Sequence, residues 1–335
     1  MKVTRINDKN IIDEIMYLRE NNTDNLLSTG FETLDQFYKI RPTNTTLIYG
    51  YPASGKSEFA LQMLVGLSAK IKGKAKKHLI YTPETGNAAE IFCEIAHSLT
   101  GKTFDKRYSN YITESEIHNV KDHIDKYFTI IDDDDSKGLT LEHYEEIVKQ
   151  VKIDNKGLDC TLIDNFNDLE HNASDLINIA SYLPTFIKSW NRISRQNKIH
   201  SFMVCHARNP NGLKSGELPK APSVYEINGG SAWFAKGQSM ICVNRPYEEI
   251  NGMMQQSNIV DIDIKKIKPK QVGKRGTVNL EFDFSKKCYY ETVNGIRKTI
   301  YSDFKTGYEI PAEVKVKIGE KIATQSNFDL NALPF

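Results

Sequence analysis

The sequence predicts an α/β protein with a mostly parallel sheet, helices on both faces and an antiparallel strand extension at one edge. Short apolar runs that read as buried strands alternate with helical stretches between residues 46 and 205, which is typical of a parallel sheet. From about residue 238, strand-like runs follow one another with only turns between them. A glycine-rich junction, YGYPASGKS, joins the first strand to the first helix.

The junction matches the phosphate-binding pattern GxxxxGKS of a P-loop, with Gly50, Gly55, Lys56 and Ser57 at the fixed positions. TLIYG before it reads as a buried strand, and SEFALQMLVGL after it carries apolar residues at helical spacing. Backbone N–H groups from Ser54 to Ser57 would face phosphates at the N-terminus of that helix. We therefore expect ATP or another nucleoside triphosphate to bind with Mg²⁺, Lys56 reaching the outer phosphates and Ser57 the metal. The alternative is a glycine-rich turn with an exposed lysine.

Polar residues follow three of the later strand-like runs, which are HLIYTP (78–83), CTLI (160–163) and SFMVC (201–205). Asp164 ends the second run, where an aspartate can position magnesium and its waters, or can cap a helix instead. Glu84 follows the first run, which we expect beside the P-loop strand, so it can activate a water or simply occupy a surface turn. His206 ends the third run, as a sensor of the terminal phosphate or as a structural histidine.

The remaining strand-like runs complete the predicted sheet. YFTII (127–131) adds a parallel strand, and SMICV, VDIDIKKI, TVNLEFDF and CYYETV form the expected antiparallel extension. The acidic run DDDD (132–135) follows a strand and precedes TLEHYEEIVKQV, which favours a loop before a helix N-terminus over a metal site.

Composition gives the chain ample apolar content, 39% of 335 residues, and no apolar run of membrane-spanning length. The start, MKVTRINDKN, lacks the apolar stretch of a signal peptide. The five cysteines are scattered without a CxxC pair, which favours buried thiols over disulfides or zinc ligands. We expect a cytoplasmic protein with no membrane partner.

Charge is unevenly distributed, although the net charge is only +1. Residues 186–220 hold seven basic and one acidic residue, and KKIKPKQVGKR from Lys265 carries six positive charges and no negative one. Such segments can bind nucleic acid or the nucleotide of a neighbouring subunit, or they are ordinary solvated loops.

Six segments, taken in order, resemble the helicase domains of DnaB/Twinkle-type ring helicases, and most closely the helicase half of phage and bacterial TOPRIM primase-helicases. The segments are STGFETLDQFYKIRPTNTTLIYGYPASGKSEFALQML, YTPETG, LIDNFND, VCHARNP, YEINGGSAWFAKG and IKKIKPKQVGKRGTVNLEF. The resemblance implies a RecA-like P-loop core over residues 27–294 and a linker helix in residues 1–26 that packs on a neighbouring subunit. The alternative for the linker is a helix packed on its own domain. The resemblance leaves residues 295–335 as a polar tail.

The resemblance also implies roles for individual residues. Lys56 and Ser57 contact phosphate and magnesium, Asp164 holds the metal, Glu84 is the catalytic base and His206 couples nucleotide state to DNA. Loops after Asp164 and His206 contact DNA in the family. The candidates here for DNA contacts are Arg208, Asn209, Lys214, Gly229, Gly230 and Ser231.

The chain departs from the family at two points. The family's lysine-x-arginine pair, which supplies an arginine finger to the next subunit, reads Lys266, Ile267, Lys268 here, with Lys270 as an alternative register. A lysine supplies charge without the planar bidentate fork of arginine. In addition, no TOPRIM primase portion precedes the P-loop, so we expect priming to need a separate primase, and a polymerase is another expected partner.

The sequence therefore predicts an ATP-dependent replicative DNA helicase of a bacterial host or its phage, which moves along single-stranded DNA as a homohexameric ring. The resemblance implies 5′ to 3′ movement. One alternative is a RecA-type recombinase or recombination mediator that forms filaments on DNA. Another is a signalling ATPase or small-molecule kinase that uses the P-loop without DNA.

Overall fold

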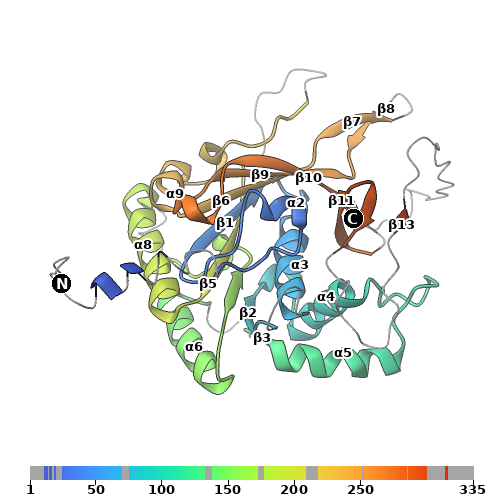
Figure 1. Ribbon diagram of the computed structural model, residues 1–335, viewed down its shortest axis with the longest axis horizontal. Helices are drawn as coiled ribbons and strands as arrows, with labels where there is room; N and C mark the ends of the chain where they lie inside the picture. The colour runs from blue at the N-terminus through green and yellow to red at the C-terminus, as the bar shows by residue number, and fades with distance from the viewer. Residues whose placement is uncertain are drawn as a thin grey trace.

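The computed structural model describes residues 11–13, 15–16, 19, 25–69, 75–132, 138–172, 177–208, 218–250, 253–284, 286–299 and 314–315. Eleven strands form one sheet in the order β13-β12-β11-β10-β9-β6-β1-β5-β4-β2-β3 (Figure 1). A separate two-stranded hairpin pairs β7 (Tyr247–Ile250) with β8 (Met253–Gln256).

Six strands make the parallel half of the sheet. They are β1 (Thr45–Gly50), β2 (His78–Tyr81), β3 (Phe128–Ile130), β4 (Cys160–Ile163), β5 (His200–His206) and β6 (Ser239–Asn244). Every residue of β1, β2, β4 and β6 is buried, because helices cover both faces, and this explains their uninterrupted apolar runs.

Two expectations about this half of the sheet are wrong. SMICV is not the start of the antiparallel extension: it forms β6, which pairs parallel to β1. An apolar run buried on both faces carries no mark of its direction, so the sequence could not decide this point. The strand before Glu84, β2, does not lie beside β1, because β5 and β4 stand between them.

The antiparallel extension begins at β9 (Ile259–Lys266), which pairs with β6, and continues through β10 (Gly276–Asp283) and β11 (Cys288–Val293). Buried and more exposed residues alternate along β9, as expected for strands with one buried face. The short strands β12 (Ile296–Lys298) and β13 (Val314–Lys315) extend the sheet past residue 294, into the segment expected to be a polar tail.

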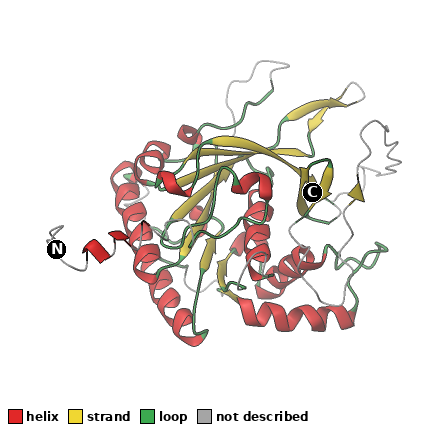
Figure 2. Ribbon diagram, viewed as in Figure 1, coloured by secondary structure: helices red, strands yellow, loops and turns green. Residues whose placement is uncertain are grey.

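Helices cover the two faces of the sheet (Figure 2). One face carries α2 (Glu32–Asp35), α3 (Lys56–Ser68), α4 (Ala88–Thr100) and α5 (Glu114–Tyr127), and the other carries α6 (Leu141–Asp154), α8 (Ile179–Asn197) and α9 (Gly230–Lys236). Short 3₁₀ turns follow the strands at residues 83–85, 166–168, 224–226 and 270–272. The structure thus confirms an α/β sheet covered on both faces, with an antiparallel extension at one edge.

The N-terminal segment is helical at residues 11–13, 15–16 and 19 and lies apart from the sheet in Figure 1. Three of its apolar side chains, Ile12, Ile15 and Met16, are each more than 40% exposed, whereas Ile11 is partly buried. The rest of this segment, most of the DDDD run and most of the C-terminal tail lie outside the described residues.

Within the described residues, no helix has both the length and the apolar character needed to cross a bilayer. All five cysteines are free thiols, and four of them are buried. The same part of the chain holds no group of three or more acidic, histidine or cysteine side chains arranged to bind a metal.

Candidate active site

The P-loop connects the end of β1 to the start of α3, at the edge of the sheet where the parallel strands end. Gly55 adopts a left-handed conformation with φ of 88°, which favours glycine. A Cβ atom on Gly50 would lie 2.2 Å from the Val243 carbonyl oxygen of β6, so the loop approaches the neighbouring strand too closely for a side chain. The glycines of the motif are therefore required by the turn itself, and α3 begins with its free N–H groups at this edge.

Lys56 is almost completely buried, at 3% exposure, and its ammonium donates to the Tyr51 carbonyl oxygen of the same loop at 2.7 Å. Burial lowers the pKa of Lys56, while the nearby Asp164 carboxylate opposes that shift. A cation held in a desolvated loop with one backbone acceptor is well suited to exchange that acceptor for a phosphate oxygen.

Asp164 and Ser57 provide the oxygens that a magnesium ion would need. Burial raises the pKa of Asp164 to about 6, and a hydrogen bond from Ser57 opposes the shift. One carboxylate oxygen of Asp164 and the hydroxyl of Ser54 are buried with no hydrogen-bond partner among the described residues. Since Mg²⁺ prefers hard oxygen ligands, an unsatisfied carboxylate beside a serine hydroxyl fits this ion.

Glu84 stands in the 3₁₀ turn after β2, with a half-exposed side chain. A cavity of about 320 Å³ brings Glu84 together with Ser57 and Asp164, although β2 is separated from β1 by two strands. The Glu84 side chain extends past the end of β4 to contact His206 on β5. Glu84 therefore lines the expected cavity, although the expected order of the strands was wrong.

His206 ends β5, which lies between the P-loop strand β1 and β4, the strand that leads to Asp164. Its Nε2 lies 3.4 Å from the Glu84 Oε2 and 3.3 Å from the Asn165 Nδ2. With a hydrogen on Nε2 the ring donates to Glu84, and without one it accepts from the Asn165 amide, so the two contacts belong to different tautomers. The position of the hydrogen on the His206 ring thus decides whether the ring bonds to Glu84 or to Asn165. This gives His206 a way to respond to the state of the site.

The candidate DNA contacts fall into a described and an undescribed group. Asn209 and Lys214 lie outside the described residues. Arg208 is exposed and donates to the Asn228 side chain at 3.2 Å, next to the glycine segment.

The glycine segment is explained by local backbone geometry and packing. Gly229 has φ of 70°, and a Cβ on Gly230 would lie 2.0 Å from the Val224 carbonyl oxygen. Of the candidates Gly229, Gly230 and Ser231, only Ser231 is exposed.

The three lysines considered for the family's lysine-x-arginine pair have different surroundings. Lys266 is 8% exposed, donates to the Phe234 carbonyl of its own chain and lies over the Phe234 ring at 5.2 Å. Burial lowers the pKa of Lys266 to about 8. Lys268 and Lys270 are exposed. Lys266 is therefore held by contacts within its own chain, whereas Lys268 and Lys270 are accessible at the surface.

No family model matches the chain. Among curated proteins, the Twinkle homolog protein, chloroplastic/mitochondrial, of Arabidopsis thaliana is 25% identical over 293 residues. The match covers 85% of this chain, which spans only 39% of that relative's length. Among solved structures, one isolated ATPase domain superposes with a TM-score of 0.66 at 17% identity, covering 86% of this chain and 99% of that one. A DnaB-like replicative helicase, described with its interactions with primase, gives 0.65 at 17% identity and covers 86% of this chain and 67% of that one.

The chain resembles the DnaB/Twinkle-type helicases. The RecA-like ATPase fold implied by its motifs is likewise confirmed by both solved structures.

In this RecA-like core, two residues beside the site were missed by the sequence reasoning. Asn165 contacts His206 from the next strand, and Tyr289 donates its hydroxyl to the Gly55 carbonyl of the P-loop at 2.8 Å. Their partners are 41 and 234 residues away in the chain. The Asn165 contact could have been suspected, since Asn165 directly follows Asp164, but no local pattern points to Tyr289.

Proposed function

We propose that the protein is an ATP-dependent replicative DNA helicase, a ring-shaped hexamer that moves along single-stranded DNA and unwinds duplex. The main support is a group of polar residues gathered at the carboxyl ends of the parallel strands. They are Lys56, Ser57, Asp164, Glu84 and His206. Movement from 5′ to 3′ follows from the resemblance alone.

The residues of this edge divide the work of ATP hydrolysis. Lys56 and the N-terminus of α3 bind the phosphates, and Ser57 and Asp164 would hold magnesium, which neutralises charge on the phosphates. Glu84 orients the attacking water and takes its proton as the water oxygen bonds to the terminal phosphorus and the bond to ADP breaks. His206, in contact with Glu84, carries the change at the phosphate toward Arg208, two residues further along the chain.

Sharing of each site between neighbouring subunits is supported by the position of Lys268. The Asn44 side chain donates to the Lys268 carbonyl at 2.8 Å, which fixes Lys268 beside the start of β1, whereas the P-loop follows its end. A six-residue strand is about 20 Å long, so Lys268 cannot reach the P-loop of its own subunit. The exposed apolar side chains of the N-terminal helical residues, including Ile12 and Met16, further support contact with a neighbour.

The proposal is tested by steady-state ATP hydrolysis with and without single-stranded DNA, repeated over a range of protein concentrations. Strong stimulation by DNA with a steep dependence on concentration is expected, and Lys56→Ala should abolish both. Strand displacement and rings in electron micrographs should follow, whereas helical filaments would indicate the recombinase. Turnover that ignores both DNA and concentration would leave a nucleotide site with another function.

Arg208 permits a direct test of DNA binding. Arg208→Ala should weaken binding to single strands and reduce the slope of log affinity against log salt by about 0.7, the value for one lost phosphate contact. Arg107→Ala is the matched control, because Arg107 is exposed in a different loop and paired with Asp105. Equal effects of the two substitutions on affinity would show a nonspecific response to net charge and would remove Arg208 from the DNA surface.

A further inference from the structure

Tyr289 of β11 lies directly against the P-loop. Its side chain is fully buried, and its hydroxyl donates to the Gly55 carbonyl oxygen at 2.8 Å. The ring packs edge-on against Phe59, one turn into α3, with the centroids 5.8 Å apart. A Cβ on Gly55 would lie 2.1 Å from the hydroxyl oxygen, so the glycine and the tyrosine fit each other.

The same residue is bound to α3 a second time, through its backbone. The fully buried Gln62 donates its amide to the Tyr289 carbonyl at 2.9 Å and accepts from the Tyr289 N–H at 2.6 Å. The Gln62 side chain thus acts as a neighbouring strand would toward this stretch of β11, and Thr299 donates to the same carbonyl at 3.1 Å. Tyr289 therefore ties α3 at its N-cap, Gly55, and again at Gln62, seven residues further along.

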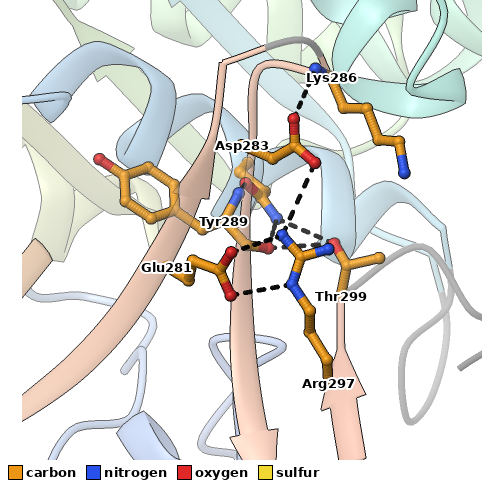
Figure 3. A network of polar contacts seen from close by, with 7 residues as sticks. Glu281, Asp283, Lys286, Tyr289, Arg297 and Thr299 are labelled. Atoms are coloured by element: carbon orange, nitrogen blue, oxygen red, sulfur yellow. Dashed lines mark hydrogen bonds and ion pairs between the residues drawn. The ribbon is translucent and has the colours of Figure 1, made fainter. Parts of the chain in front are cut away.

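The strand that carries Tyr289 is itself held firmly in the sheet. Arg297 of β12 donates to both carboxylate oxygens of Glu281 on β10, at 2.9 and 3.0 Å (Figure 3). Its guanidinium also lies 3.6 Å from the centroid of the Tyr290 ring. Next to Tyr290 on β11, the buried Glu291 carboxylate accepts from the backbone N–H groups of Glu32 and Thr33, at the start of α2. Tyr289 therefore connects β11, a strand held firmly in the sheet, to the P-loop.

This contact bears on phosphate binding through the geometry of one peptide unit. In a trans peptide the C=O and the following N–H point in opposite directions, so holding the Gly55 carbonyl toward Tyr289 directs the Lys56 N–H away from it. Gly55 carries no side chain and has access to many backbone conformations. A fixed hydroxyl restricts that freedom at the residue where the N–H groups for the phosphates begin.

We propose that Tyr289 is a positioning residue for the P-loop, which holds the Gly55–Lys56 peptide in the orientation that binds phosphate. The inference rests on the nucleotide site of the proposed function. It extends that site to the antiparallel edge of the sheet. It also makes nucleotide affinity depend on the β10–β12 strands, through the Tyr289 hydroxyl.

The test is Tyr289→Phe in the full chain, with Tyr290→Phe as the matched control. Binding of Mg-ATP and of Mg-ADP is measured without DNA, together with the melting temperature and the kinetic constants. The Gly55 carbonyl keeps its helical bond from Phe59 N–H at 3.0 Å, so loss of the hydroxyl leaves no buried acceptor unsatisfied and the chain should fold.

Tyr289→Phe should weaken both nucleotides about three- to tenfold, the effect of one hydrogen bond, with a larger rise in KM than fall in kcat and an unchanged melting temperature. Tyr290→Phe should bind like the wild type. Wild-type affinity in Tyr289→Phe overturns the inference, as does an affinity loss that both variants share or that accompanies a lower melting temperature. Weaker nucleotide binding in Tyr289→Phe, in a protein whose wild type ignores DNA, would keep the inference and reject the helicase proposal.

Discussion

Asp164, proposed as a magnesium ligand, is a single buried side chain whose charge lowers the stability of the fold. Its pKa is raised from 3.8 to about 6, chiefly by burial, so the folded state holds a carboxylate that prefers to be protonated. The ionised form is therefore disfavoured on folding, and the penalty is absent below pH 3.8, grows between pH 3.8 and 6 and is complete above pH 6.

Asp164→Asn should therefore stabilise the protein while ending magnesium-dependent turnover. We expect the free energy of unfolding at pH 7.5, measured by urea titration with EDTA present, to rise by about 1 to 3 kcal/mol. The gain should shrink as the pH falls from 6 toward 4. Asp122→Asn, on the exposed surface of α5, is the control. A loss of stability in Asp164→Asn at pH 7.5 would contradict the prediction.

Glu84 is expected to act on the water and not on the nucleotide. Glu84→Gln should keep ATP affinity and lower kcat about 100-fold or more, because the amide cannot accept the proton. Glu94→Gln is a demanding control, since Glu94 lines the same cavity but is paired with Lys287 at 2.6 Å. If Glu94→Gln abolished turnover and Glu84→Gln did not, the base would have to be reassigned.

At the scale of elements, the sequence located strands better than it arranged them. CTLI and CYYETV became β4 and β11 at their predicted bounds, because each is an apolar or aromatic run that polar residues delimit. The order of strands depends on which helices cross which face, so the place of β2 and the direction of β6 were not predictable from local pattern. The β7–β8 hairpin was missed, as its exposed residues do not alternate between apolar and polar.

The candidate site shows the same division. Lys56, Ser57 and Asp164 could be found because a loop motif and a strand end mark them in the sequence. Tyr289 could not, since its role arises from an antiparallel strand folding back onto α3 from far along the chain. Nor could the sequence separate Lys266 from Lys268: only the structure buries one and exposes the other.

The segment just after β9 carries Lys268, and mixing experiments can test whether this lysine acts in the nucleotide site of a neighbouring subunit. Lys56→Ala and Lys268→Ala should each be nearly inactive alone, the first without nucleotide and the second without the neighbour's cation. When the two proteins are mixed, some interfaces pair an intact P-loop with an intact Lys268, so ATP hydrolysis should recover partly. Mixing Lys56→Ala with Lys270→Ala tests the alternative register. Two inactive variants that fail to restore activity in either mixture would argue against a shared site.

For the whole molecule, the opposite positions of the P-loop and Lys268 restrict the possible assemblies. If the cation of one subunit serves the nucleotide of the next, the two surfaces in contact are different, which makes the interface head-to-tail. Such an interface generates a closed ring or an open filament according to the rotation between subunits. The proposed ring and the alternative filament are therefore two outcomes of one contact, and electron microscopy distinguishes them directly.

The stability of the whole fold should fall as the solution becomes mildly acidic, because two histidines are buried in the sheet. The pKa of His78 on β2 is lowered from 6.5 to about 3, by burial first and then by His123 and Lys76, against the opposing effect of the Leu64 backbone. The pKa of His200 on β5 is lowered to about 4 by burial, against the Arg41 carbonyl. Only the unfolded chain takes up these protons, so the penalty is absent above pH 6.5 and grows as the pH falls toward the folded values.

Each histidine should lower the free energy of unfolding by about 1.4 kcal/mol at pH 5.5 relative to pH 7.5. Protonation of Asp164 over the same pH range should raise it by about 1 kcal/mol. Urea titrations at the two pH values should therefore show a net loss of about 2 kcal/mol. His78→Leu, which places an apolar side chain beside Phe128, should reduce that loss by about 1.4 kcal/mol, with the exposed His143→Leu of α6 as the control. An unchanged difference between the two pH values in His78→Leu would mean that this ring does not remain neutral in the folded sheet.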